Sequence, residues 1–394
     1  MKIGIVSSYF YPWYGGITEH VYHQYKELKA RGHEVKLITP FDGSGVLQDC
    51  RDLIRIGRPV PLLLNGSVVK VPVLTRGKET VNRILADEQF DVVHLHQPLF
   101  CVLGLTFLRC IINLRNENRP VPAVVGTFHA CGGGSERFLV HRLGFFFRRF
   151  SDCFDYRIAV SAASKDFIQP VLPGPFAVIP NGVDIERFST VKEKIGRFDD
   201  GVLNILFVGR LEPRKGLTRL LRSIPYIQNH TSKKFRLLVV GNGVLTPYYK
   251  SRVPSEAIDK VIFTGEVSVD ELPRYYNTAH LFCSPATYGE SFGIVLVEAM
   301  AAGLPVVAGN NEGYSRIVRQ NVNGFLVNSE SPQEIAINIA NLLESEDLRR
   351  RFSERNRFEA RKYSWNSIVD KIETIYSGIT GQISPERCYD RQTG

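Results

Sequence analysis

The sequence predicts an α/β protein built from two doubly wound parallel sheets. Short apolar runs that end in small residues alternate with amphipathic segments along the first half of the chain, and the pattern starts again after residue 200. Such runs are typical of buried parallel strands, and strand–helix alternation places helices on both faces of a sheet. A chain of 394 residues is long enough for two units of this kind.

Six strands are expected in the first half. They are MKIGIVSS, EVKLITP, DVVHLHQP, PAVVGTFHA, YRIAVS and FAVIPNG. An amphipathic helix over Gly16–Arg31 follows the first strand and ends at Gly32, because glycine commonly stops a helix. The apolar stretch Leu99–Leu114 is interrupted by polar residues, so a buried helix is expected there and not a membrane span.

Six further strands are expected in the second half. They are LNILFVGRL, FRLLVVGNG, VIFTGEV, AHLFCSP, LPVVAGN and GFLVN. The polar stretch STVKEKIGRFDDGV before them is expected to be a linker, and the domains are expected to span residues 1–185 and 186–364. Charged helices run from about Pro332 to about Gly378, and the tail SPERCYDRQTG is expected to be disordered.

Composition and charge narrow the class of protein. The seven cysteines include no C-x-x-C pair, which argues against a disulfide framework and against a zinc site. The N-terminus lacks the pattern of a signal peptide, so a cytoplasmic location is expected. A net charge of +9 suits anionic small molecules or an anionic membrane surface, and no motif for nucleic-acid binding is present.

A group of cations follows the first strand of the second half. In VGRLEPRKG, Arg210, Arg214 and Lys215 lie within six residues of one another at the end of a strand. Ligands of open α/β sheets bind at the carboxyl ends of the strands, and arginine with lysine suits a diphosphate. A diphosphate-binding loop is therefore expected, against the alternative of a solvated charge cluster.

Two glutamates, Glu290 and Glu298, bracket a loop and the start of a helix in GESFGIVLVEAMAAG. Gly293 is expected to begin that helix, again just after a strand. One interpretation is a buried helix with a satisfied interior carboxylate. The other is that both carboxylates accept hydrogen bonds from hydroxyls of one elongated ligand, which together with the cations would be a nucleotide-sugar.

The first half offers a glycine pair and several histidines. Gly15 and Gly16 lie in the first strand–helix loop, where they are a weak phosphate-binding signal. His129 is expected at a strand end, facing the ligand. The pairs His94/His96 and His20/His23 resemble metal-ligand spacing without a third ligand, and the chain has no Asp-x-Asp, so no metal is expected to hold the diphosphate.

These motifs together resemble the retaining glycosyltransferases of the GT-B fold, family 4. The resemblance rests on GESFGIVLVEAMAAG with its Glu-x7-Glu spacing, VGRLEPRKG, IPNGVD and the N-terminal Gly-Gly loop, and it covers about residues 1–380. Within the family, GTFHA, RIAVS and ESFGIVLVEAMAAG are most similar to the phosphatidyl-myo-inositol mannosyltransferases. The resemblance implies two Rossmann-like domains that face a central cleft, with residues 1–185 binding the acceptor, residues 186–364 binding the donor, and the helix at 365–380 packing back on the first domain.

The resemblance also implies roles for individual residues. It implies catalytic roles for His129, Arg210, Lys215 and Glu290. It implies donor contacts from Gly15, Gly16, Arg210, Arg214, Lys215, Val267, Glu290, Ser291, Phe292, Gly293, Ile294, Val295 and Glu298. It implies acceptor contacts from Tyr9, Thr18 and His129.

The implied reaction is hexosyl transfer with retention of configuration. The acceptor attacks on the face that the diphosphate leaves, the diphosphate accepts the acceptor's proton, and cations stabilise its growing charge without an essential metal or other cofactor. The favoured function is transfer of mannose from GDP-mannose to a phosphatidylinositol-type lipid at the cytoplasmic face of the membrane. Two alternatives stay open: a soluble family-4 enzyme that transfers GlcNAc or glucose from a UDP-sugar to a small polar acceptor, and a non-catalytic nucleotide-sugar-binding protein.

The segment RFLVHRLGFFFRRF, residues 137–150, combines many apolar residues with four arginines and no acid. One interpretation is a core helix whose arginines reach the surface. The other is an interfacial segment that inserts aromatic rings into a membrane while its arginines meet anionic headgroups. The residues expected to contact the membrane are Arg137, Arg142, Phe145, Phe146, Arg148 and Arg149.

Overall fold

The computed structural model describes residues 1–13, 15–44, 47, 50–64, 67–130, 140, 142, 144–190 and 193–381. The predicted disordered tail, residues 384–394, and the predicted membrane residue Arg137 lie outside the described residues. The chain forms two compact units. Unit 1 holds Met1–Gly182 and residues 365–381, and unit 2 holds Val183–Ser364.

Unit 1 is an α/β unit around a parallel sheet. Its strands are β1 (Lys2–Ser7), β2 (Glu34–Thr39), β3 (Leu53–Arg55), β4 (Arg58–Leu64), β5 (Ser67–Val73), β6 (Val92–His96), β7 (Ala123–Phe128), β8 (Tyr156–Ala159) and β9 (Ala177–Val178). Its helices are α1 (Gly16–Ala30), α2 (Gly77–Glu88), α3 (Val102–Asn116), α5 (Ala162–Ile168) and α13 (Trp365–Ile379). Within the described residues the sheet has the order β3-β2-β1-β6-β7-β8-β9, and neighbouring strands are parallel.

Unit 2 has the same architecture. Its strands are β10 (Leu203–Val208), β11 (Phe235–Val240), β12 (Val261–Gly265), β13 (Leu281–Ser284), β14 (Val306–Gly309) and β15 (Gly324–Val327). Its helices are α6 (Ile185–Thr190), α7 (Leu217–His230), α8 (Thr246–Ser251), α9 (Leu272–Thr278), α10 (Ile294–Ala302), α11 (Pro332–Glu344) and α12 (Glu346–Ala360). The parallel strands have the order β12-β11-β10-β13-β14-β15 among the described residues.

Both sheets have a point at which the strand order reverses. In unit 1 the reversal lies between β1 and β6, and in unit 2 it lies between β10 and β13. Loops that leave neighbouring strands at such a switch point diverge to opposite faces of the sheet and leave a crevice, which is where α/β proteins bind ligands. The predicted fold class, an α/β protein with two doubly wound parallel sheets, is confirmed.

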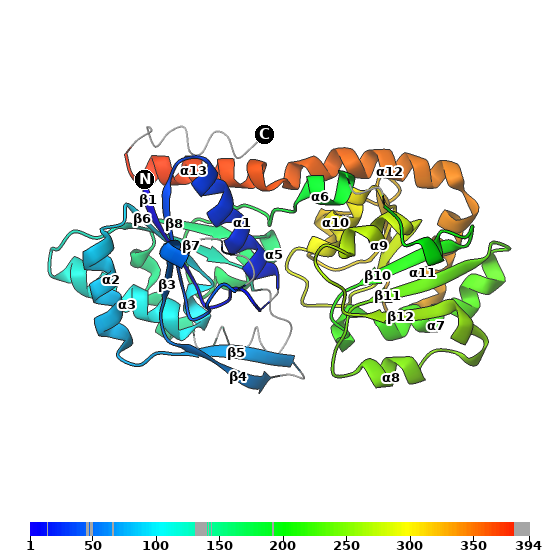
Figure 1. Cartoon of the computed structure of the whole chain (residues 1–394), viewed down its shortest axis with the longest axis horizontal. Helices are drawn as coiled ribbons and strands as arrows, with labels where there is room; N and C mark the ends of the chain where they lie inside the picture. Colours follow the sequence, from blue (N-terminus) through cyan, green and yellow to red (C-terminus); the bar gives the residue numbers. More distant parts are fainter. Residues whose placement is uncertain are drawn as a thin grey trace. The chain divides into compact units, whose positions relative to one another are not determined.

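The last helix of the chain belongs to unit 1, where α13 lies beside α1 (Figure 1). Its buried face, which includes Trp365, Ile368 and Ile372, packs into the same apolar cluster as residues of β1 and β2. At the far end of α1, Arg31 Nη1 donates to Glu373 Oε2 at 2.7 Å. The C-terminal segment therefore completes the core of the unit that begins the chain.

Two details of the organisation differ from the sequence-based expectation. The stretch 189–202 is not a linker, because Ile195 and Phe198 are buried in the core of unit 2. The expectation also omitted β3 and the antiparallel pair β4–β5. The sequence carries a signal for that pair, Asn65-Gly66 between two apolar runs, although these two residues lie outside the described part of the chain.

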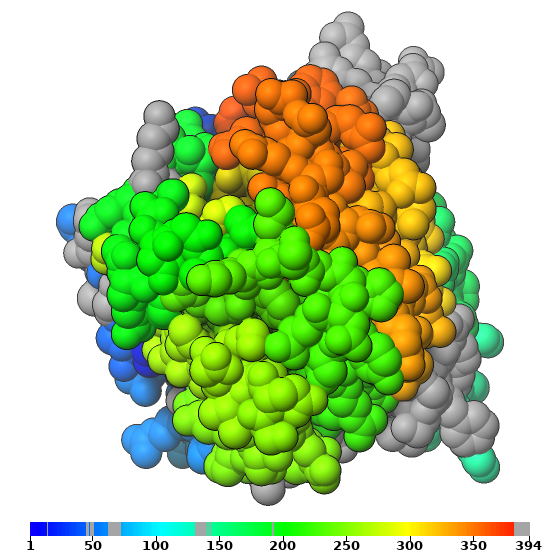
Figure 2. Space-filling model, turned by 90° about the vertical axis from the view of Figure 1, so that its right-hand side faces the viewer, coloured from blue at the N-terminus to red at the C-terminus, as the bar shows by residue number. Residues whose placement is uncertain are grey.

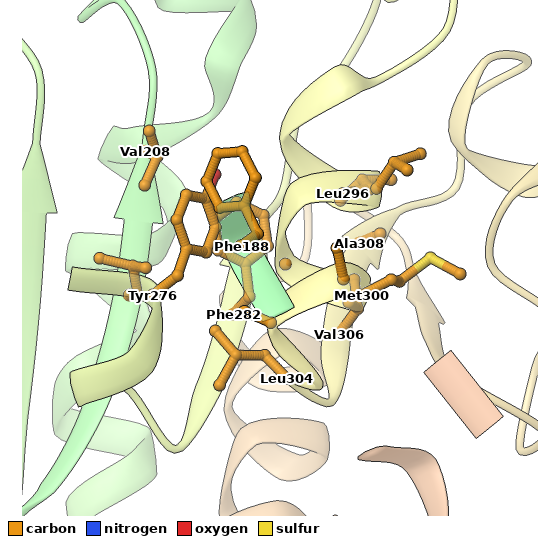
Figure 3. Packing of buried hydrophobic residues seen from close by; sticks show 14 of the residues in the cluster. Phe188, Val208, Tyr276, Phe282, Leu296, Met300, Leu304, Val306 and Ala308 are labelled. Carbon is orange, nitrogen blue, oxygen red and sulfur yellow. The ribbon is translucent and has the colours of Figure 1, made fainter. Parts of the chain in front are cut away.

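The core of unit 2 supports the helix that carries Glu298. Phe188, Tyr276 and Phe282 gather beside β10, and Leu296 and Met300 of α10 lie next to them (Figure 3). On the outside of unit 2, α12 lies at the surface (orange in Figure 2). Among the described residues of both units, no helix is long and apolar enough to cross a membrane.

Candidate active site

The cation-rich loop of unit 2 directly follows β10, at the switch point. Gly216 ends a short 3₁₀ turn, Pro213–Lys215, with a φ of +75°. A Cβ at this position would lie 2.0 Å from the carbonyl oxygen of Pro285, which follows β13. Glycine is therefore required here, and its absence of a side chain lets the loops after β10 and β13 touch.

Glu290 lies in the second of these loops and contacts two cations of the first. Its Oε1 accepts from Arg214 Nη1 and from Lys215 Nζ, each at 2.6 Å. The residue is 8% exposed. A carboxylate buried to this extent is costly without a partner, and here the two cations pair with it at the switch point.

Glu212 extends this ion network, and sequence reasoning missed it. Its carboxylate accepts from Arg214 Nε at 2.9 Å and lies 3.2 Å from Arg210 Nη1. Although burial lowers the pKa of Arg214, the charges of Glu290 and Glu212 outweigh burial and raise it. The five residues form a chain of alternating charge, in the order Arg210, Glu212, Arg214, Glu290, Lys215. Arg210 is the most open of the predicted cations, with a side chain 66% exposed.

A buried tyrosine, Tyr314, lies beside Glu290 of this network. The Tyr314 hydroxyl is hydrogen-bonded to Ser284 Oγ at 3.0 Å, at the end of β13. Burial, followed by the charge of Glu290, raises the pKa of Tyr314 well above its usual value, so its hydroxyl stays protonated. Gly293 has a φ of +96°, and a Cβ there would meet the Tyr314 ring at 2.6 Å. This contact explains why glycine precedes α10, as the sequence predicted for the start of that helix.

Glu298 occupies a different environment within α10. It is 8% exposed, and its Oε2 accepts a hydrogen bond from the Tyr276 hydroxyl of α9 at 2.7 Å. Tyr276 belongs to the core described above (Figure 3). The carboxylate is therefore a hydrogen-bonded interior group at the edge of the core, and its predicted contact with a ligand stays a prediction.

The other predicted donor residues occupy the same edge of unit 2 or the first loop of unit 1. Phe292 is buried against Tyr363, with ring centroids 5.5 Å apart. Val267, Ile294 and Val295 are half-buried and pack against the core of unit 2. The remaining three are distributed as follows: Ser291 is half-buried between Glu290 and Phe292, Gly15 is the N-cap of α1, and Gly16 is its first residue.

In unit 1, His129 follows β7 directly and is almost fully buried. Its Nε2 is hydrogen-bonded to Nδ1 of His96, the last residue of β6, at 3.0 Å. The Gln97 side-chain oxygen accepts from the backbone N–H groups of His129 and Ala130, at 2.6 and 3.1 Å. Sequence reasoning missed Gln97, whose left-handed backbone (φ 51°) places its amide across the end of the neighbouring strand.

Four histidines of unit 1 form one cluster. The rings of His94 and His96 stack with centroids 4.6 Å apart, and the His20 ring lies 5.2 Å from His96 and 5.1 Å from His129. Burial lowers the pKa of His20 to about 4, although its hydrogen bond to Asn181 opposes the shift. Burial, followed by repulsion between neighbouring histidines, lowers the pKa of the other three well below the usual value. All four imidazoles are therefore neutral near pH 7.

The IPNGVD motif connects this cluster to α13. His20 Nδ1 donates to Asn181 Oδ1 at 2.7 Å, and the His20 and Trp365 ring centroids lie 5.2 Å apart. A Cβ on Gly182 would lie 2.4 Å from the indole of Trp365. The Asn-Gly pair thus binds one histidine and makes room for the helix that completes unit 1. His23 stacks on the same indole, with centroids 4.9 Å apart.

The two remaining predicted acceptor residues lie near the first strand–helix loop of unit 1. Tyr9 is half-buried, and burial raises its pKa. The buried Thr18 hydroxyl donates to the carbonyl of Trp13 at 2.7 Å, which ties α1 to the preceding loop. Among the described residues of the chain, no three His, Cys, Asp or Glu side chains are grouped to hold a metal ion.

The described part of the segment 137–150 presents aromatic side chains outward. Phe145 is 79% exposed and Phe146 is 59% exposed, whereas Phe147 packs against the core of unit 1. Arg142, Arg148 and Arg149 are exposed on the same stretch. The segment is therefore partly a core element through Phe147 and partly an exposed aromatic and basic surface.

Comparison with known proteins identifies the class of this molecule. Residues 14–187 match the model of the Glycosyltransferase Family 4, and residues 189–358 match that of the Glycosyl transferases group 1. The Anabaena protein HepE, solved in complex with UDP, has the same fold, with a TM-score of 0.73 at 21% identity over 96% of this chain and 100% of that one. The fold is that of the GT-B glycosyltransferases, as the sequence resemblance implied.

Curated relatives match along nearly the whole chain. The phosphatidyl-myo-inositol mannosyltransferase of Mycobacterium tuberculosis is 31% identical, covering 97% of this chain and 98% of its own length. That of Mycobacterium leprae is 30% identical over 96% of this chain and 97% of its own. The chain belongs to glycosyltransferase family 4. It is an enzyme, a hexosyltransferase, which excludes the non-catalytic alternative.

Proposed function

We propose that this enzyme transfers mannose from GDP-mannose to a phosphatidylinositol-type lipid, with retention of configuration, at the cytoplasmic face of the membrane. The identity of 30–31% with phosphatidyl-myo-inositol mannosyltransferases, over nearly their full length, supports mannose as the transferred sugar and a phosphatidylinositol-type lipid as the acceptor. The observation that carries the proposal is the ion network of Glu290, Arg214 and Lys215 at the switch point of unit 2.

In the proposed complex, unit 2 binds the donor. Lys215 and Arg210 bind the diphosphate. Glu290 accepts hydrogen bonds from the transferred hexose, with residues 291–293 close by, and Glu298 accepts from the ribose. Val267 and the first turn of α10, with Ile294 and Val295, lie along the nucleoside.

Unit 1 binds the acceptor through Tyr9, Thr18 and His129. The acceptor hydroxyl attacks the anomeric carbon as the bond to the diphosphate breaks, and its proton passes to the departing diphosphate. Because His129 is buried and neutral, it can form a hydrogen bond to the sugar without adding a charge. Negative charge grows on the diphosphate, where Lys215 stabilises it.

Donor binding tests this assignment. Calorimetric titration with GDP-mannose, GDP-glucose, UDP-glucose and UDP-GlcNAc, in buffer containing EDTA, is expected to give saturable binding with GDP-mannose preferred. Selective binding of a UDP-sugar would favour the alternative, a family-4 enzyme with a small polar acceptor. Binding that appears only when manganese or magnesium is added would contradict the proposal that no metal is needed, while leaving the donor assignment in place.

We also propose that the exposed surface of Arg142, Phe145, Phe146, Arg148 and Arg149 contacts anionic lipid. Each basic residue near an anionic surface contributes about 1 kcal/mol, and exposed aromatic rings add apolar burial at the acyl boundary. The protein is expected to sediment with anionic but not zwitterionic vesicles, less so at high salt. Changing Arg142, Arg148 and Arg149 to Gln should abolish this binding.

A matched variant controls for net charge. Changing Arg350, Arg351 and Arg355 of α12 to Gln removes the same charge from unit 2. It should sediment as the wild type does, and both variants should bind donor equally. Equal sedimentation of the wild type and the variant at 142, 148 and 149 would exclude this surface as the membrane contact and would favour a soluble acceptor.

A further inference from the structure

Arg214 ties the two loops of the unit 2 switch point together more completely than any neighbouring cation in the described residues. Its Nη1 donates to Glu290 Oε1 at 2.6 Å and to the carbonyl of Gly289 at 3.3 Å. Its Nε donates to Glu212 Oε2 at 2.9 Å. Its own carbonyl accepts from the N–H of Thr287 at 2.9 Å and from the Thr287 hydroxyl at 3.2 Å.

Lys215 contacts the same carboxylate oxygen in a different way. Its ammonium lies 2.6 Å from Glu290 Oε1 at the end of a flexible stem. An ammonium can rotate to a new partner, whereas a guanidinium seated between two carboxylates loses several oriented hydrogen bonds when it moves. The two cations that hold Glu290 are therefore not equivalent.

The burial of Glu290 decides which cation can leave. If both cations turned to a diphosphate, a carboxylate only 8% exposed would lose both of its cationic partners, which is strongly unfavourable for a buried charge. If only Lys215 turns, Arg214 still neutralises Glu290, and Glu212 still holds Arg214. Exchange of Lys215 alone is thus the less costly response to an arriving diphosphate.

We infer that Arg214 is a positioning residue, held by Glu212, that keeps Glu290 directed at the transferred sugar and does not bind the diphosphate. This inference rests on the proposed function and changes one of its expectations, because the family resemblance implied a donor contact from Arg214. It also gives Glu212 a role, since its carboxylate fixes the guanidinium through Nε. Lys215 is then the cation that passes from Glu290 to the diphosphate when the donor binds.

The affinity for a nucleoside diphosphate shows whether Arg214 contacts the diphosphate or only positions Glu290. GDP and UDP lack the sugar, so their affinity reports on the diphosphate site without Glu290's proposed partner. Arg214→Lys is expected to bind the preferred nucleotide within about twofold of wild type, yet to lower kcat for the nucleotide-sugar about tenfold or more. Lys215→Ala should weaken binding of the same nucleotide. Affinity of Arg214→Lys reduced as much as that of Lys215→Ala would overturn the inference.

Glu212→Gln tests whether Glu212 acts by holding Arg214. If Glu212 acts through Arg214, the double variant with Arg214→Lys should lose no more kcat than Arg214→Lys alone, whereas losses that multiply would contradict the link. Arg219→Lys, in the exposed pair with Glu330, is the matched control and should behave as wild type. A wild type that binds neither GDP nor UDP would instead contradict the proposed function itself. Melting temperatures within a few degrees of wild type confirm that each variant is folded.

Discussion

Replacing Lys215 with alanine is expected to lower kcat about a hundredfold or more while leaving the protein folded. The effect is large because the ammonium, on a loop that Gly216 lets pack against Pro285, has turned from Glu290 to the diphosphate once the donor is bound, where it stabilises the negative charge of the transition state. Folding should be spared, since Arg214 still pairs with Glu290 at 2.6 Å when the lysine is gone. Steady-state kinetics with the preferred nucleotide-sugar gives the measurement.

Lys233→Ala is the matched control for this variant. Lys233 is exposed and precedes β11, so it lies at the amino end of the same sheet whose carboxyl end carries Lys215. It should leave kcat unchanged. A Lys215→Ala protein with wild-type circular dichroism and wild-type kcat would rule out the diphosphate assignment.

Acidification below about pH 6.5 is expected to destabilise unit 1 steeply. The pKa of His20 falls to about 4 in the folded protein, and burial lowers the pKa of His94, His96 and His129 as well. The unfolded chain binds protons at these histidines near their usual pKa of about 6.5, whereas the folded chain does not. Stability is thus complete above about pH 6.5 and is lost as the pH falls from there toward 4, by up to about 1.4 kcal/mol per pH unit for each histidine.

The two tryptophans allow the loss of stability to be measured in unit 1 alone. Trp13 and Trp365 both belong to unit 1, so urea unfolding followed by tryptophan fluorescence reports on that unit. The free energy of unfolding, measured between pH 7.5 and 5, should fall by several kcal/mol. His230→Gln, which changes an exposed histidine of unit 2, should show the same dependence. A free energy that stays constant over this range would mean that the cluster is charged or hydrated in the folded protein.

Much of the fold could be predicted because its strands are buried on both faces. Runs such as LNILFVGRL and FRLLVVGNG are apolar on both faces, so they are buried only as strands of a parallel sheet covered by helices. Each of them forms a strand in the structure. The pair β4–β5 was missed because RPVPLLL has two prolines and lacks the pattern of a buried strand. The stretch 189–202 looked like a linker because its polar residues obscure Ile195 and Phe198, whose burial depends on the rest of unit 2.

The candidate site could be predicted only in part. Arg210, Lys215 and Glu290 could be proposed as neighbours because each follows a strand, a position that can be read from the sequence. That the loops of β10 and β13 meet depends on strand order, which no local pattern encodes. Residues such as Glu212 and Gln97 were missed for the same reason, since their importance lies in partners that only tertiary structure supplies.

The most direct test of the account is the product of the reaction. Purified enzyme incubated with GDP-mannose, whose mannose is α-linked, and vesicles containing phosphatidylinositol should release GDP and form a mannosylated lipid. The one-bond carbon–proton coupling at the new anomeric centre, measured by NMR, distinguishes the two configurations. An α-linked mannosyl lipid is expected with the wild type and should be lost in Lys215→Ala. A β-linked product, or release of GDP with no mannosylated lipid, would contradict it.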